Sequence, residues 1–325
     1  MQMPKLQSPK SKTFSSTKSL LKISVIIPGH NRPDSLRETL NALREQTLSP
    51  KYYEVIMVGF VGTSLQEVAN ENAKIAKHSF QYVEIGTRWP DAKRNEGIRL
   101  SKSPIIAFTD DDVLPQKDWL EKIIEKFEEN PDALGVEGAT EGDNTPLLSH
   151  ATKNVKGNEF PTCNMSFRKE ILMKVNGFDE AYNFFREETD IAYQVLQHGK
   201  IIFSPEVKVF HPTRKTKPAQ ILNELEMIRG EIRLYKKFPK LYSKNYLQKF
   251  PKIIGRGGWL QAAVSWTVVF GIITTAIYAP HWFFFSIVMG IIVLFLFRFL
   301  LSFRNRTSTW IEKISVFIYM LVRDL

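Results

Sequence analysis

The chain has 325 residues and a formal net charge of +10. The length allows a large core, and the single cysteine, Cys163, excludes both an internal disulfide framework and a zinc site built on cysteines. An apolar fraction of 43% excludes a mainly disordered chain. Residues 23–211 carry 22 basic and 29 acidic side chains, whereas residues 212–256 carry 12 basic and 3 acidic ones. The acidic body disfavours nucleic acid as a partner, because phosphate contacts need lysine and arginine.

The front of the chain alternates two hydrophobic patterns. Residues 1–21 have lysines but no apolar run of a signal peptide, so we expect a disordered basic tail. In residues 22–217, short apolar runs indicate buried strands and amphipathic stretches indicate helices. Strands are expected at 21–28, 53–58, 81–85 and 105–109, and helices at 33–43, 65–78, 91–101 and 119–130. This alternation predicts an α/β fold, a Rossmann-like, mostly parallel sheet with helices on both faces.

Three consecutive aspartates end the fourth expected strand. The carboxylates of Asp110, Asp111 and Asp112 repel one another, and such a run is tolerated where a cation lies among them. On an extended backbone the first and third point to one side and the second to the other. Asp110 and Asp112 could therefore share one divalent ion. The spacing alone supports a solvated acidic turn as well as it supports a metal site.

Five groups of short segments carry the strongest functional signal. They read SVIIPGHNR at 24–32, KRNEGI at 93–98, FTDDDV at 108–113, CNMSFR at 163–168 with VNGFDE at 175–180, and EETDIA at 187–192 with FSPE at 203–206 and VFHP at 209–212. In this order they resemble family 2 glycosyltransferases with a GT-A fold, over about residues 22–212. The resemblance implies inverting transfer of a sugar from a nucleotide-diphosphate donor, with Mn²⁺ or Mg²⁺ as the cofactor.

The resemblance also implies roles for the matching residues. The metal ligands would be Asp112, Asp110 and His211. The base that takes the acceptor proton would be Glu188, at the family's Asp position, or its neighbour Glu187. Both could instead serve the start of a helix, where negative charge is favourable. The donor would be bound by Pro28, His30, Asn31, Arg32, Phe60, Arg94, Asp110 and Asp111, and the acceptor side would include Asn164, Met165 and Asp179.

The second expected strand departs from the family pattern. In the family this strand ends in an acidic pair or Asp-x-Ser whose first aspartate reads the nucleobase, whereas Gly59 and Phe60 stand here. Stacking of Phe60 on the base is our hypothesis in its place. The glutamine–arginine–tryptophan motif of processive synthases is missing after residue 190, which favours single addition over polymerisation.

The end of the chain is predicted to be membrane-bound. Residues 257–297 contain no Asp, Glu, Lys or Arg, and about 20 apolar residues suffice for one crossing. Residues 257–301 are therefore predicted to form two transmembrane helices, with a buried hairpin in a large core as the alternative. Residues 218–256 would form an amphipathic, basic juxtamembrane segment, and residues 302–325 a cytoplasmic interfacial helix. The positive-inside rule places the catalytic domain and both termini in the cytoplasm.

Taken together, the sequence predicts an integral protein of the cytoplasmic membrane. It would transfer a sugar from a nucleotide-diphosphate sugar to a lipid-linked or surface-glycan acceptor. One alternative is a polyprenyl-phosphate glycosyl synthase, although the GFDE segment at 177–180 counts against it. The other is a catalytically inactive scaffold or binding protein with the same fold, which the missing acids of the second strand would support.

Overall fold

The computed structural model describes residues 20–143, 149–150, 152–182, 185–215, 224–244 and 255–302. The strands are β1 (Ile23–Pro28), β2 (Tyr53–Phe60), β3 (Ser79–Ile85), β4 (Ile105–Phe108), β5 (Leu114–Pro115), β6 (Ala133–Glu141), β7 (Ser149–His150), β8 (Met165–Arg168), β9 (Lys200–Phe210) and β10 (Arg214–Lys215). The helices are α1 (Pro33–Arg44), α2 (Leu65–Ile75), α3 (Pro90–Leu100), α4 (Trp119–Glu129), α5 (Lys169–Lys174), α6 (Glu187–Leu196), α7 (Glu224–Lys237), α8 (Pro239–Tyr242), α10 (Gly255–Tyr278) and α11 (Phe283–Ser302).

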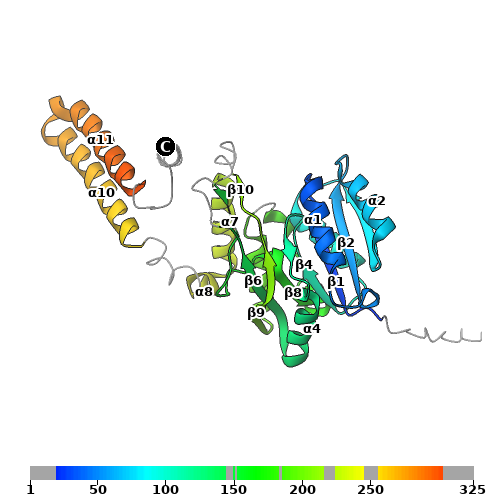
Figure 1. Cartoon of the computed structure of the whole chain (residues 1–325). Helices are drawn as coiled ribbons and strands as arrows, with labels where there is room; N and C mark the ends of the chain where they lie inside the picture. The colour runs from blue at the N-terminus through cyan, green and yellow to red at the C-terminus, as the bar shows by residue number, and fades with distance from the viewer. Residues whose placement is uncertain are drawn as a thin grey trace, which may run out of the picture.

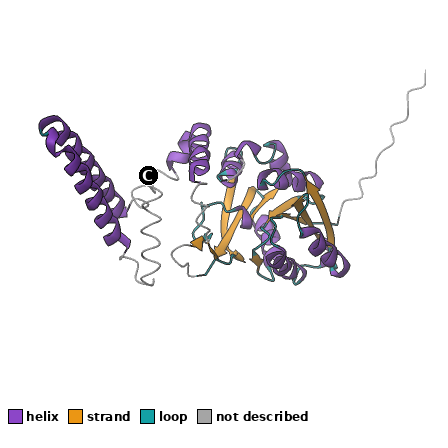
Figure 2. Ribbon diagram, turned by 90° about the horizontal axis from the view of Figure 1, so that it is seen from above, coloured by secondary structure: helices purple, strands orange, loops and turns teal. Residues whose placement is uncertain are grey.

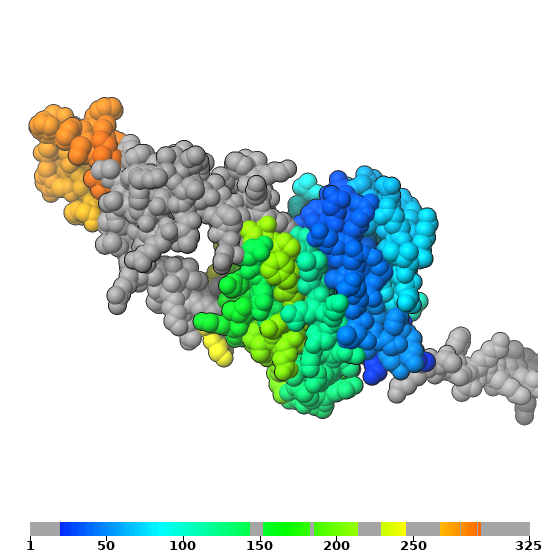
Figure 3. Space-filling view, in the orientation of Figure 1, coloured from blue at the N-terminus to red at the C-terminus, as the bar shows by residue number. Residues whose placement is uncertain are grey.

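An eight-stranded mixed sheet forms the centre of the main domain, in the order β3-β2-β1-β4-β8-β6-β9-β5 (Figure 1). The α/β fold predicted from the sequence is confirmed, and each of the eight expected elements is present. Strands β3, β2, β1 and β4 are mutually parallel, as predicted. The second half of the sheet is mixed, because β8 runs antiparallel to both β4 and β6. Figure 3 shows the two halves packed side by side.

Side chains of the central strands divide between two apolar clusters. Ile23, Val25 and Ile27 of β1 belong to the cluster that includes α1, α2 and α4. Ile26 belongs to the cluster on the other face, with Ile98 of α3 and residues of α6. This division follows from the two-residue period of a strand, and it leaves helices on both faces of the sheet (Figure 2). Burial on both faces explains why the strands appear in the sequence as continuous apolar runs.

The parallel pairing determines where functional groups can gather. Ile23–Pro28 pairs in register with residues 53–58 of β2, and its first four residues pair with all of β4. The carboxyl ends of these strands therefore meet at one edge of the sheet. In open α/β sheets, ligands bind beyond this edge. The loops that follow β1, β2 and β4 all begin there.

The amide of Asn164 fastens α4 to two strands in the second half of the sheet. Its Oδ1 accepts a hydrogen bond of 2.8 Å from the indole of Trp119, on α4. Its Nδ2 donates to the carbonyl oxygens of Ala139, on β6, at 2.8 Å and of Val207, on β9, at 2.9 Å. The three bonds tie together two strands and a helix at one buried point.

Replacing Asn164 by alanine is expected to lower the free energy of unfolding by about 3 kcal/mol. The substitution leaves one buried donor and two buried carbonyls without their partner, and each such group costs about 1–3 kcal/mol. Urea unfolding of the purified chain measures the loss. Asn70→Ala, on the exposed side of α2, is the matched control and is expected to stay within about 0.5 kcal/mol of the wild type. Equal stability of the two variants would contradict the fastening role.

The C-terminal helices correct a prediction. Within the described part of the chain, no helix combines the length and the apolar character that a bilayer crossing requires. The prediction of two transmembrane helices over residues 257–301, and with it of an integral protein of the cytoplasmic membrane, is therefore wrong. Residues 255–302 instead form α10 and α11, joined by a short turn at Pro280–Trp282. The predicted basic tail, except residues 20 and 21, and residues 303–325 of the predicted interfacial helix lie outside the described residues.

Candidate active site

The aspartate run and a histidine from the end of β9 form a candidate metal site. Asp110, Asp112 and His211 each offer one ligand atom, and these atoms lie within 4.8 Å of one another. Ligands of one octahedral ion lie about 2.1 Å from it, so opposite ligand atoms are separated by about 4.2 Å. Separations of up to 4.8 Å are close to this value, so two carboxylates and an imidazole could hold a single divalent cation here. The backbone N–H of His211 donates to the carbonyl oxygen of Glu141 at 2.7 Å, which fixes the residue after β9 to the end of β6.

Two arginines balance the negative charge of the cluster. Arg32, from the loop after β1, contacts Asp111 and lies 3.1 Å from Asp112 Oδ2. Arg94, on α3, lies 3.2 Å from Asp110 Oδ1 and 3.2 Å from Glu187 Oε1. Burial opposes the charged form of Asp110, but the positive charge of Arg94 and other neighbours outweighs it and lowers the pKa of this carboxyl. Arg94 thus links the candidate metal site to the acidic pair at the start of α6.

Asp111 has a different environment from its two neighbours. It is buried, and its Oδ2 accepts a hydrogen bond of 2.5 Å from the backbone N–H of His30. Burial raises the pKa of Asp111 to about 6, although Arg32 acts in the opposite direction. Burial and the charge of Arg32 lower the pKa of His30 to about 4. Asp111 therefore holds the loop after β1 against the cluster, which leaves Asp110 and Asp112 to face His211.

The acidic pair occupies the first turn of α6. Glu187 is buried and is held by Arg94. Glu188 is half-buried, and burial together with its neighbour Glu187 raises the pKa of Glu188 to about 8. A carboxyl with this pKa can exchange a proton near neutral pH. The two glutamates therefore differ in chemistry, since one is tied into an ion pair and the other is poised to titrate.

Sequence reasoning missed two buried charged residues of α3. Lys93 is 1% exposed, and its Nζ donates to the carbonyl oxygen of Gly29 at 2.6 Å. Burial lowers the pKa of this amine to about 8. Asp91 is fully buried at the start of the same helix, and burial raises the pKa of its carboxyl to about 6. The run of charged residues at 91–94 was the available signal, but a run of this kind usually marks a solvent-exposed face.

At the end of β2, the position of Gly59 is crowded by a tyrosine of β3. A Cβ atom at Gly59 would lie 2.5 Å from the hydroxyl oxygen of Tyr82, which reaches across from β3. That hydroxyl donates to Oε1 of Glu84, also on β3, at 2.6 Å. Phe60 is partly exposed at the end of β2.

Asn31, after β1, accepts a hydrogen bond of 2.9 Å from the hydroxyl of Ser64, which joins the loops after β1 and β2. Pro28, a further predicted donor contact, is the last residue of β1.

The three residues predicted for the acceptor side differ in burial: two are buried inside the domain and one is partly exposed. Asn164 uses its amide inside the domain, as described above, and Met165 is buried at the start of β8. Asp179 is partly exposed, and its Oδ2 lies 3.1 Å from Arg233 and 3.2 Å from Lys237, both on α7. An acceptor hydroxyl at Asp179 would therefore have to compete with two cations.

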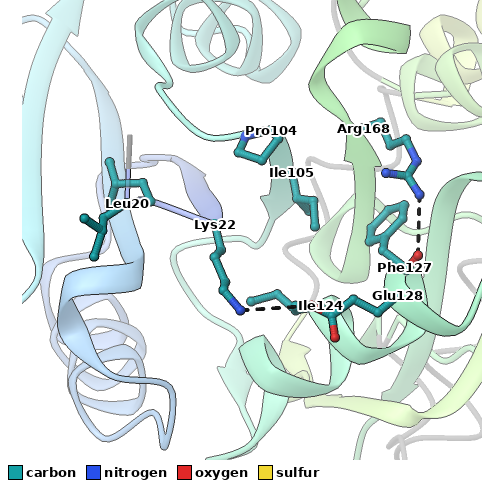
Figure 4. Close-up of a pocket in the computed structure, with 9 residues that line it drawn as sticks. Leu20, Lys22, Pro104, Ile105, Ile124, Phe127, Glu128 and Arg168 are labelled. Atoms are coloured by element: carbon teal, nitrogen blue, oxygen red, sulfur yellow. Dashed lines mark hydrogen bonds and ion pairs between the residues drawn. The ribbon is translucent and has the colours of Figure 1, made fainter. Parts of the chain in front are cut away.

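A cavity of about 380 Å³ lies at the opposite, amino end of β1 and β4. Its walls are mainly apolar and include Lys22, Ile105 and Phe127 (Figure 4). Lys22 lies 4.0 Å from Glu128 at its rim. None of its lining residues belongs to the acidic cluster or to the acidic pair, so this cavity is separate from the candidate active site.

Comparisons with known proteins agree with this arrangement. The family model for glycosyl transferase family 2 matches residues 24–188. Glycosyltransferase AglE of Haloferax volcanii is 34% identical over 110 residues, which cover 33% of this chain and 35% of AglE. A glucosyl-dolichyl phosphate glucuronosyltransferase of the same organism is 24% identical over 183 residues, covering 49% of this chain and 56% of that protein. The mannosyltransferase PcManGT from Pyrobaculum calidifontis, solved with GDP-Man and Mn²⁺, superposes with a TM-score of 0.58 at 17% identity, covering 84% of this chain and 85% of PcManGT.

These matches differ in what they show. The similarity to PcManGT concerns the fold alone, and it confirms the predicted GT-A type of α/β domain. The chain spans about a third of the length of AglE and about half that of the glucuronosyltransferase. The family match extends over half of the chain, from β1 through the aspartate run to Glu188. The chain therefore belongs to glycosyl transferase family 2.

Proposed function

We propose that this protein transfers a sugar from a nucleotide-diphosphate sugar to a lipid-linked or glycan acceptor, with inversion and with a divalent metal ion. One observation carries the proposal. Arg94 joins Asp110 of the candidate metal site to Glu187, beside Glu188, with two contacts of 3.2 Å. A site for the leaving diphosphate and a site for a general base, the two that a one-step displacement needs, are thus joined by one buried arginine.

Residues of this chain have distinct tasks in such a displacement. The acceptor oxygen attacks the anomeric carbon while the bond from that carbon to the diphosphate breaks. Glu188 takes the acceptor proton as its oxygen attacks. Arg32 and Arg94, which already lie against carboxylates of the cluster, bind and orient the phosphates. A cation bound by Asp110, Asp112 and His211 would supply further positive charge for the diphosphate leaving group.

The contacts of the acidic pair support Glu188, rather than Glu187, as the base. Glu187 is buried, and its carboxylate is already engaged in an ion pair with Arg94. Glu188 has a raised pKa of about 8, so its carboxylate binds a proton more strongly. The efficiency of a general base is greatest when its pKa lies near the working pH.

The name of one relative supports the choice of acceptor class. The glucuronosyltransferase of Haloferax volcanii is named for a glucosyl-dolichyl phosphate, which is a lipid-linked sugar. A similar acceptor for this chain would bring its own lipid to the enzyme. This part of the proposal concerns the acceptor only and is independent of the donor chemistry.

Nucleotide sugars are expected to raise the melting temperature of the protein only when a divalent metal is present. A ligand at 100 times its Kd stabilises a folded protein by about 2.7 kcal/mol, which corresponds to a shift of several degrees. Thermal unfolding measures this shift in melting temperature. UDP-glucose, UDP-GlcNAc and GDP-mannose are each tested with Mn²⁺, with Mg²⁺ and with EDTA. Uridine and guanosine are the controls, since they lack the diphosphate. If no nucleotide sugar shifted the transition with either metal, the proposed donor class would be wrong.

A further inference from the structure

The backbone that leads into α6 has an unfavourable conformation. Phe185 has a φ of 76° and Arg186 a φ of 75°, in the left-handed region that residues other than glycine rarely adopt. The two residues come directly before Glu187 and Glu188. Two successive strained residues persist only where surrounding structure holds them, and such strain is concentrated at functional sites.

Helix α7 holds this strained turn at two points. The guanidinium of Arg186 donates from Nε to Glu231 Oε1 at 2.9 Å, and the hydroxyl of Tyr242 donates to Glu231 Oε2 at 2.8 Å. Gly230 allows the close approach, because a Cβ atom there would lie 2.6 Å from the carbonyl oxygen of Phe185. That contact is with backbone, which cannot move aside as the end of a flexible side chain can.

The same helix is anchored to α6 beyond the turn. Lys237 Nζ lies 2.8 Å from a carboxylate oxygen of Asp190, which is fully buried in the first turn of α6. Leu234 is also fully buried, and Phe238, just after α7, meets the ring of Tyr193 edge-on at 5.6 Å. The position of α7 is therefore determined by an ion pair and by apolar packing, so its contacts at the strained turn are made by a fixed element.

We propose that Gly230 and Glu231 of α7 are positioning residues for Glu188. They hold Phe185 and Arg186 in the left-handed conformation from which α6 begins, and so they set where the carboxyl of Glu188 lies. This inference rests on the proposed function, in which Glu188 is the base. It assigns a role in the reaction to α7, which lies after the residues that the family model matches. Helix α7 itself supplies no group that reacts.

The first test is Glu231→Gln, which keeps the shape of the side chain and removes its charge. We expect kcat to fall about 10- to 100-fold, the range that a small misplacement of a reacting group produces. The KM for the donor should change less than about twofold, because Arg32, Arg94 and the metal ligands are untouched. Steady-state release of nucleoside diphosphate from the donors of the thermal screen, with the better of the two metals, measures both constants in the full chain.

Two further sets of variants separate positioning from a general loss of structure. Arg186→Gln should lower kcat as Glu231→Gln does, and the double variant should be no worse than either single one, because both remove one contact. Lys236→Gln, an exposed position of α7, is the matched control and should keep the wild-type kcat. Additive losses from Arg186→Gln and Glu231→Gln would overturn the inference.

Gly230→Ala gives the sharpest test. Alanine adds a Cβ atom that would meet the carbonyl oxygen of Phe185, so the helix and the turn must move apart. If α7 only covered the domain, this shift would leave the activity of the enzyme unchanged. Positioning by close approach requires the opposite, a fall in kcat of at least tenfold with the fold retained by circular dichroism. Wild-type kcat in this variant, or in Glu231→Gln, would overturn the inference while the proposed function stood. If the wild-type chain itself turned over no donor, the proposed function would fail and the inference with it.

Discussion

Asp112→Asn is expected to lower the turnover of nucleotide sugars at least about 10³-fold while the protein stays folded. Asp112 lies with Asp110 and His211 in the candidate metal site, and an amide is a poorer ligand for a divalent cation than a carboxylate. Lewis-acid stabilisation of a leaving phosphate contributes several kcal/mol, and about 4 kcal/mol corresponds to this factor. Release of nucleoside diphosphate in the presence of saturating Mn²⁺ measures the effect.

Binding of the metal itself provides an independent readout of Asp112→Asn. Titration of the purified protein with Mn²⁺, followed by electron paramagnetic resonance of the free ion, should show weaker binding in the variant. Asp118→Asn is the matched control, since Asp118 precedes α4 and its side chain makes no capping hydrogen bond. If Asp112→Asn kept both turnover and Mn²⁺ affinity, the three residues would not form the metal site.

Glu188→Gln is expected to lower kcat by about 10²- to 10⁴-fold, the usual contribution of a general base. The wild-type enzyme should also show a rise of kcat/KM with pH, with a midpoint near 8. The sign follows from the chemistry, since the carboxyl of Glu188 carries a proton below its pKa of about 8 and can accept one only above it. Measuring kcat/KM with Mg²⁺ between pH 6 and pH 9 gives the midpoint.

The neighbouring glutamate provides the comparison that identifies the base. Glu187→Gln removes one of the two carboxylate partners of Arg94 and a negative charge beside Glu188, so the pH midpoint should move to lower pH while much of the activity remains. Glu170→Gln, at an exposed position of α5, should match the wild type throughout. A pH rise that survives in Glu188→Gln, together with retained kcat, would assign the base to another residue.

Local sequence patterns were sufficient for the framework of the domain. The apolar runs of β1, β2 and β4 and the stripe of leucines along α1 correctly predicted alternating strands and helices, because burial on a strand or a helix leaves a period in the sequence. The aspartate run was located at the end of β4 for the same reason. The family followed from several short segments in a fixed order.

The contacts that define the site could not be obtained in this way. Arg94 and Glu187 are 93 residues apart, and no local period indicates that they meet. The uncharged stretch at 257–297 led to the prediction of two membrane crossings. A crossing requires a single helix that is both long and apolar enough, and an absence of charge alone does not ensure this.

The residues around α7 show most clearly what the sequence determines and what only the tertiary structure decides. The sequence by itself predicted an amphipathic, basic segment at 218–256, and it left open whether Glu187 and Glu188 act as the base or serve the start of a helix. Only the tertiary structure decided that Glu231 binds Arg186, that Lys237 binds Asp190, and that Gly230 lies against the backbone of Phe185. Helical periodicity arises from neighbours three and four residues apart, whereas these contacts depend on how remote segments pack, and packing is decided by the whole domain at once.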